Sequence, residues 1–107
     1  MAEVAPLQLV AAMEDVAVVL DRHQVPVVGL DGRRAYPFES ASAAVTVTVH
    51  LDSARCIDLV ADLFDLDTGD LSESDDLYTR GGHRQPGVYL SVYGPPHKAA
   101  TVAEVAS

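Results

Sequence analysis

The chain has 107 residues, of which 49% are hydrophobic and 21% charged, a composition typical of one globular domain and not of a disordered chain. Its formal net charge of −9 repels nucleic-acid phosphates and anionic membranes and attracts cations or basic proteins. The single cysteine, Cys56, excludes an intramolecular disulfide framework and a zinc site built from four cysteines.

The first predicted element is an amphipathic helix over residues 6–23. Pro6 occupies a position that the first turn of a helix tolerates, and apolar residues follow at helical spacing, among them Leu9, Met13 and Leu20. Acidic and basic residues fall mostly on the opposite side. We expect this helix to bury one face.

A pair of strands is predicted next. Val25 to Leu30 is apolar and β-branched, and Asp31-Gly32 is a strong hairpin signal. The chain would return over Arg33 to Tyr36, where Pro37 limits the strand to an edge of the sheet.

The clearest strand lies over residues 45–51, where valines and leucine alternate with Thr46, Thr48 and His50. Asp52 then has the position of an N-cap for a second helix that continues through Phe64. Cys56 adjoins the apolar face of this helix, so we interpret it as a buried structural thiol and not as a nucleophile.

Two further strands, Leu77 to Arg80 and Val88 to Tyr93, are predicted to pair as a hairpin across residues 81–87. The sum is an α+β domain over residues 1–94 with the order α-β-β-β-α-β-β. A C-terminal tail over residues 95–107 is either a short helix or disordered. Because the strands alternate apolar and polar residues, we expect a mostly antiparallel sheet with two helices packed on one face.

The segment 64–76, FDLDTGDLSESDD, raises the question of a calcium site, since nine of the sixteen acids fall between residues 52 and 76. An EF-hand loop starting at Asp65 would place Gly69 at position 5 and Asp70 at position 6, which transposes the required residues. Asp76 at position 12 is shorter than the usual Glu, and no helix is predicted to follow. We therefore predict an acidic loop without a metal, with weak cation binding in another geometry as the alternative.

No linear motif for catalysis or for a cofactor is present. The four histidines lack HxxxH and HExxH spacing, and no CxxC, G-x-S-x-G or phosphate-binding glycine motif occurs. We expect no metal, no cofactor and no enzymatic activity. A small enzyme without a recognisable motif stays open as an alternative.

One group of residues points to binding. If strands 45–51 and 88–93 are neighbours, their outward side chains share a polar and aromatic sheet face that suits protein recognition. A solvated face on which Thr and Tyr are merely favoured in strands is the alternative. The predicted partner-binding residues are this face and the acidic loop: Thr46, Thr48, His50, Tyr89, Ser91, Tyr93, Asp65, Asp67, Asp70, Asp75 and Asp76.

The leading hypothesis is therefore a small acidic protein-interaction domain of the antitoxin, immunity, inhibitor or viral accessory type, from a bacterium or phage. A domain that binds a small molecule or a metal, with His50, Tyr89 and Tyr93 lining a shallow pocket, is the runner-up. We expect a protein partner of basic character, or a homodimer through an unpaired edge strand, and no direct contact with nucleic acid or membrane. Without a signal peptide or a membrane-length apolar run, the predicted location is the cytoplasm.

Overall fold

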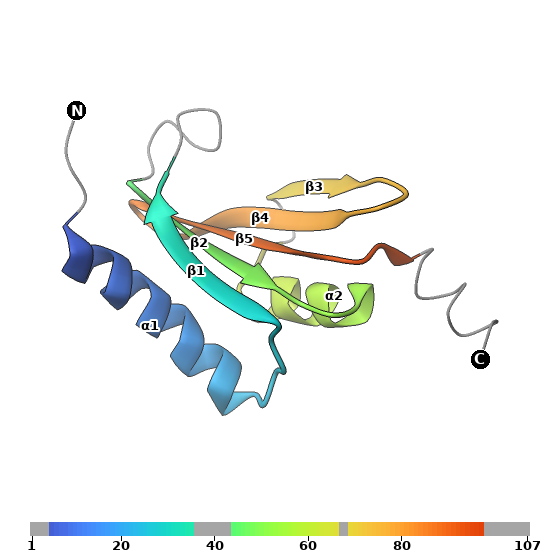
Figure 1. Cartoon of the computed structure of the whole chain (residues 1–107), viewed down its shortest axis with the longest axis horizontal. Helices are drawn as coiled ribbons and strands as arrows, with labels where there is room; N and C mark the ends of the chain where they lie inside the picture. Colours follow the sequence, from blue (N-terminus) through green and yellow to red (C-terminus); the bar gives the residue numbers. More distant parts are fainter. Residues whose placement is uncertain (1–4, 36–43, 67–68, 98–107) are drawn as a thin grey trace.

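In the computed structural model, two helices pack on one face of a five-stranded sheet (Figure 1). The structure describes residues 5–35, 44–66 and 69–97. The strand order is β1-β2-β5-β4-β3, with β2 and β5 parallel and the other pairs antiparallel. The predicted α+β class, mostly antiparallel sheet and one-sided helix packing are confirmed. The elements in chain order are α1 (Pro6–Arg22), β1 (Gly29–Arg34), β2 (Val45–His50), α2 (Ala54–Leu63), β3 (Asp70–Glu73), β4 (Tyr78–Gln85) and β5 (Val88–Gly94).

At the start of each helix, a side-chain oxygen accepts a hydrogen bond from a backbone N–H. At α1, the Gln8 side-chain oxygen accepts a hydrogen bond from the Ala5 N–H at 2.8 Å. At α2, Ser53 Oγ accepts from the Cys56 N–H at 3.2 Å, so Ser53 and not the predicted Asp52 is the N-cap. Ser53 has the extended backbone that this role requires, and Asp52 lies one residue too early.

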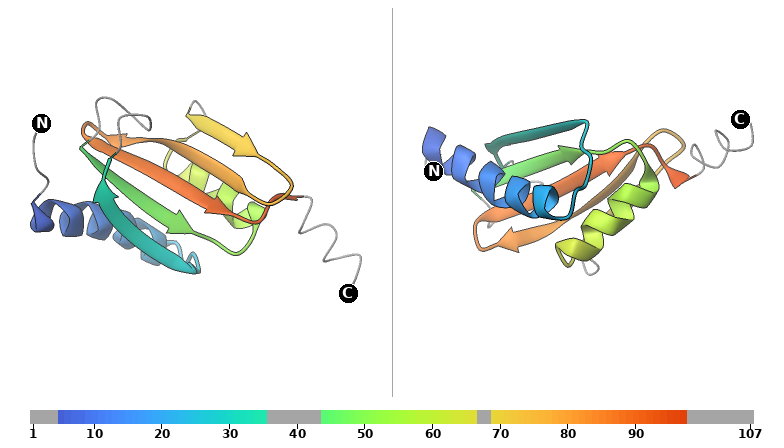
Figure 2. Two further views of the ribbon diagram at one scale, coloured as in Figure 1. Left: turned by 45° about the horizontal axis from the view of Figure 1, so that its top comes forward. Right: turned by 90° about the horizontal axis from the view of Figure 1, so that it is seen from below.

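The hydrophobic core lies between the two helices and the sheet face that they cover. α1 covers β1 and β2, and α2 covers β4 and β5 (Figure 2). Cys56 is half-buried and packs against this core, as a structural thiol would. The side chains with no exposed surface include Val16, Val47, Val49, Ile57, Val60, Leu90 and Val92.

The predicted hairpin at Asp31-Gly32 is wrong, because Gly29–Arg34 is one continuous strand. The glycine serves helix packing instead of a turn: a Cβ at Gly32 would lie 2.7 Å from Met13 Cγ on α1. Residues 25–28, which were predicted to belong to this strand, precede β1 and are not part of it. Tyr36 and Pro37 lie outside the described residues.

The acidic segment also differs from the prediction, since it contains the edge strand β3. The observed order is therefore α-β-β-α-β-β-β, with one strand moved from before α2 to after it. The predicted hairpin of β4 and β5 is present, but its turn is shorter. β4 continues through residues 81–85 and leaves only Pro86 and Gly87, with φ +87° at Gly87, to reverse the chain.

Contacts of the domain extend past residue 94, where the sequence placed its boundary. Pro96 has less than 2% of its side chain exposed, and the His97 N–H donates to Glu73 Oε2 at 2.8 Å. The predicted tail over residues 95–107 is thus partly integrated into the fold, and its remainder, 98–107, lies outside the described residues.

Candidate functional site: the open face of the sheet

The sheet face opposite the helices carries the residues that the sequence analysis singled out. β2 and β5 pair in parallel, so Thr46 is beside Tyr89, Thr48 beside Ser91 and His50 beside Tyr93. All six therefore lie together, as alternation predicted. The registers of the other strands add residues from β1, β4 and β3 to the same side. We call this surface the open face: Gly29, Asp31, Arg33, Thr46, Thr48, His50, Tyr89, Ser91, Tyr93, Thr79, Gly81, His83, Asp70 and Ser72.

Aromatic rings on the open face are held by their neighbours. His50 and Tyr93 stack with ring centroids 4.7 Å apart and 7° between their planes. His83 meets Tyr89 edge to face at 5.7 Å. The Tyr89 hydroxyl donates to Asp70 Oδ2 on β3. Each of these rings thus has a position defined by contacts within the domain.

Gly81 explains how Tyr89 reaches across β4. A Cβ at Gly81 would overlap the Tyr89 hydroxyl, so glycine is needed for the ring to lie over the neighbouring strand. This arrangement also covers part of the face: Tyr89 is 8% exposed and Thr46 0%, whereas Thr48, Ser91 and Tyr93 are half-buried. The face offers hydroxyl and imidazole donors and acceptors around fixed rings, which is chemistry for recognition.

The predicted acidic residues do not form one loop. Asp65 follows α2 with a positive φ of 56°, and Asp70 lies on β3. Asp75 and Asp76 are exposed in the turn between β3 and β4. Only Asp70 joins the open face, and Asp67 lies outside the described residues.

A charged cluster on the helix side was missed by the sequence analysis. We define it as Asp58 of α2, Glu73 of β3, Tyr78 and Arg80 of β4, and His97. His97 Nδ1 lies 2.8 Å from Glu73 Oε2, and its Nε2 lies 2.8 Å from Asp58 Oδ2. Asp58 Oδ1 accepts from the Tyr78 hydroxyl and lies 3.6 Å from Arg80 Nη1. Only an imidazolium donates from both ring nitrogens, so this geometry describes protonated His97.

Contacts within the cluster shift the pKa values of His97, Glu73 and Asp58. Hydrogen bonds to Asp58 and then to Glu73 raise the pKa of His97. The pKa of Glu73 is lowered by the His97 backbone N–H and then by its side chain. Burial opposes ionisation of Asp58, yet hydrogen bonds from Tyr78 and His97, with the charges of His97 and Arg80, together lower its pKa.

This cluster joins distant segments and has the character of a structural contact. Both His97 nitrogens are engaged by carboxylates, so neither is available as a general base while the contacts persist. Among the described residues, no three His, Cys, Asp or Glu side chains converge in a way that could hold a metal ion. Nothing in the local sequence connects these residues, because Asp58 is 39 positions from His97 and 20 from Tyr78.

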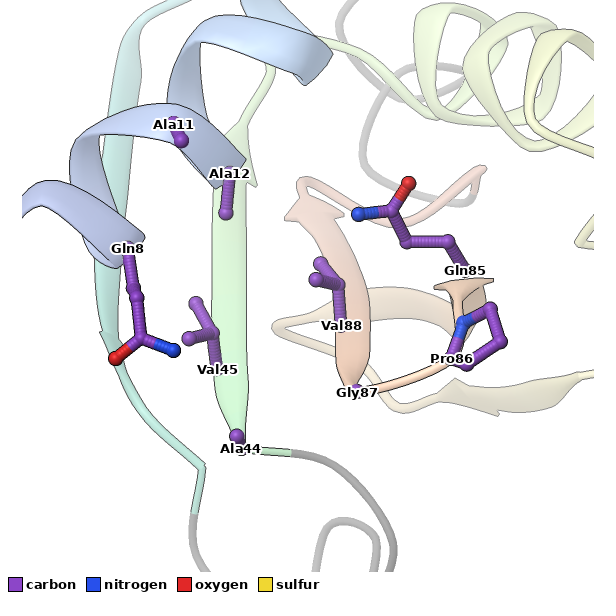
Figure 3. Close-up of a pocket in the computed structure, with 9 residues that line it drawn as sticks. All are labelled: Gln8, Ala11, Ala12, Ala44, Val45, Gln85, Pro86, Gly87 and Val88. Carbon is purple, nitrogen blue, oxygen red and sulfur yellow. The ribbon is translucent and has the colours of Figure 1, made fainter. Parts of the chain in front are cut away.

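Two hollows lined by described residues lie on the helix side of the sheet. One of about 320 Å³ separates α1 from the start of β5, with Gln8 and Gln85 on opposite sides and alanine, valine and proline between them (Figure 3). A second, of about 440 Å³, is lined by α1 and Arg84, whose Nε donates to Asp15 Oδ2 at 2.9 Å. Neither contains His50, Tyr89 or Tyr93, so these hollows do not correspond to the predicted small-molecule pocket.

No known protein family and no curated protein matches this chain. In the part of the chain that the structure describes, none of the helices combines the length and apolar character needed to cross a bilayer.

Proposed function

We propose that this chain is a non-enzymatic protein-recognition domain that binds a protein partner through its open face. One observation carries the proposal: across all five strands, the described positions on this face hold polar residues, aromatic residues and glycine, without an aliphatic side chain. A partner would meet rings that are already oriented, so little side-chain entropy is lost on binding. Tyrosine and histidine there combine an apolar surface with a polar group, as interface residues do.

The proposed partner is basic. At the β3 edge the open face carries Asp70, and Asp75 and Asp76 extend its acidic character into the turn after β3. At the β1 edge Asp31 lies on the same face as Arg33. With a net charge of −9, the chain attracts a cationic protein and accelerates the encounter. The proposed class is therefore an antitoxin, immunity, inhibitor or viral accessory protein that works in the bacterial cytoplasm and is encoded by a bacterium or a phage.

The test is affinity capture from the native cell with two matched variants. Ser91→Arg puts a long cation in the centre of the open face, and Leu59→Arg makes the same charge change on α2, where Leu59 is 51% exposed. We expect wild type and Leu59→Arg to capture the same protein and Ser91→Arg to lose it. Capture by all three at equal yield would contradict the proposal.

The electrostatic part of the proposal has its own test. Reversing Asp75 and Asp76 to lysine should weaken binding at low salt and have little effect at high salt, where exposed charges are screened. Affinity that is unchanged by the reversal in both conditions would remove the basic character of the partner from the proposal. It would leave recognition by the open face itself in place.

A further inference from the structure

The two edges of the sheet are β1 and β3, and they differ in charge. Among the described residues, no strand pairs with the outer side of β1, which reads Gly-Leu-Asp-Gly-Arg-Arg. An edge strand of six residues offers backbone donors and acceptors for another strand. Hydrogen-bond direction, charge and the helix beneath β1 determine which strand fits this edge.

Hydrogen-bond direction fixes which residues of β1 are available. The Ala35 N–H donates to Ala44 O, so by alternation the odd-numbered residues face β2. The backbone groups of Leu30, Gly32 and Arg34 then point outward. Arg33 Nη1 donates to Arg34 O at 3.2 Å, which places the Arg33 guanidinium at this outer edge.

Charge makes β1 complementary to itself. In an antiparallel pair of two β1 strands, outward-facing residues must oppose each other, which leaves few registers. A register centred on Gly32 places Asp31 of each copy opposite Arg33 of the other. Shifting the strands by two residues either way sets Asp31 against Asp31 or Arg33 against Arg33, and like charges directly opposite are destabilising.

The other edge has the opposite design. Asp70 lies on the open face and Glu73 on the covered face, so pairing two β3 strands would gather two Asp70 carboxylates on one face and two Glu73 carboxylates on the other. β3 has no basic residue to offset them. This edge is protected from self-association by its own charge, as edge strands commonly are. Of the two edge strands, β1 is therefore the one suited to pair with a second copy.

The helix below β1 adds an apolar contribution. Met13 of α1 packs against Gly32, and the opposite flank of α1, with Gln8 and Asp15, lines the hollows toward β4 and β5. Helical spacing puts Val10 and Ala17 on the β1 side, and Val10 is 54% exposed. Since α1 packs beneath β1 and β2, pairing two β1 strands at a spacing of about 4.8 Å would bring the two α1 axes to about 10 Å, a helix-packing distance.

We propose that two copies of this chain associate through antiparallel pairing of their β1 strands about a two-fold axis at Gly32. Asp31 of each copy pairs with Arg33 of the other on the open face, and the α1 flanks meet beneath. The sheets become one continuous sheet, whose open face is doubled and whose two ends are the acidic β3 strands. This proposal goes beyond the function proposed above and does not depend on it.

Charge reversal gives a test with an internal rescue. Asp31→Arg and Arg33→Asp each replace two attractive pairs by two repulsive ones, and we expect each to weaken dimerisation on the order of a hundredfold. Because the two single variants are complementary, their equimolar mixture should form a heterodimer. The double variant Asp31→Arg/Arg33→Asp should dimerise by itself. Sedimentation equilibrium measures all four samples and wild type.

The control Asp62→Arg makes the same charge change on the exposed side of α2 and should dimerise as wild type does. Far-ultraviolet circular dichroism of every variant separates loss of pairing from loss of fold. Wild type that stays monomeric up to about 1 mM would overturn the proposal. A dimer that survives both single reversals, or single variants that do not complement each other, would overturn it equally.

Discussion

The two faces of one sheet use the same strands for different purposes. On the covered face, Leu90 and Val92 of β5 have no exposed surface and pack under the helices. Their chain neighbours Ser91 and Tyr93 point to the open face, beside Thr48 and His50 of β2. Alternation along each strand therefore separates the apolar surface that packs under the helices from the polar and aromatic surface on the other side of the sheet.

The two faces also differ in the contacts that their polar and charged residues make. The covered face continues at its margin into the charged cluster, where His97, Asp58 and Glu73 join three segments by ionic hydrogen bonds. On the open face, ring contacts and the Tyr89–Asp70 hydrogen bond hold aromatic side chains in place. Acidic residues therefore occur here in two settings: Asp58 and Glu73 join segments of the chain, whereas Asp75 and Asp76 lie exposed on the surface.

The largest difference in stability between the two faces is expected from substitutions at two adjacent residues of β5. Leu90→Ala removes a fully buried side chain and should cost about 2–5 kcal/mol in the free energy of unfolding. Ser91→Ala on the open face should change the same quantity by less than about 0.5 kcal/mol. Urea unfolding measures both, and equal losses would show that the open face belongs to the core.

A substitution in the charged cluster should lower the free energy of unfolding less than a substitution in the core. It should lower it more than substitution of an exposed charge elsewhere. Asp58→Asn removes the countercharge of His97 and Arg80, and because Asp58 is 45% exposed we expect a loss of about 1 kcal/mol. Asp62→Asn on the exposed side of the same helix is the matched control and should be close to neutral. If the two variants had equal stability, the cluster would contribute nothing measurable to the fold.

Within the open face, Gly81→Ala tests how Tyr89 is held. The added methyl group would displace the Tyr89 ring and break its hydrogen bond to Asp70, at a cost of about 1 kcal/mol. Tyr89→Phe removes the same hydrogen bond and leaves room for the ring, so it should cost no more than that. A change in the near-ultraviolet circular dichroism of Gly81→Ala would report the displaced ring, and an unaltered spectrum with full stability would contradict the placement.

The smallest expected effect is a pH dependence that originates in the cluster. A raised pKa of His97 means that its contribution to stability is complete below the ordinary histidine pKa and is lost as pH rises through the raised value. The lowered pKa values of Asp58 and Glu73 mean that their contributions are complete above the ordinary carboxyl values and are lost as pH falls through the lowered ones. His97→Gln should flatten the alkaline decline in melting temperature. A decline of unchanged slope in that variant would assign it to another group.

Local patterns in the sequence predicted the open face well. Alternating residues in 45–51 and 88–93 identified the six residues that β2 and β5 bring together, because a strand side is determined by a period of two. The hairpin at Asp31-Gly32 was wrong because tertiary packing decided the role of the glycine: Met13 occupies the space that a side chain would need. Turn propensity alone contains no information about that helix.

The charged cluster was beyond the reach of the sequence for a different reason. Its members come from α2, β3, β4 and the residues after β5, and their meeting depends on strand order. Edge strand β3 was not predicted either. The acids of FDLDTGDLSESDD are typical of a loop, and the four residues of β3 are all exposed. Local propensity had no buried residue to detect there.

If the open face contacts a protein partner, site-specific photo-crosslinking in the native cell should capture that partner from this face. A photoreactive amino acid in place of Tyr93 lies on the open face, and the same amino acid in place of Leu59 lies on the outer side of α2. We expect a specific crosslinked protein for position 93 and none for position 59. A crosslink from position 59 alone would contradict it.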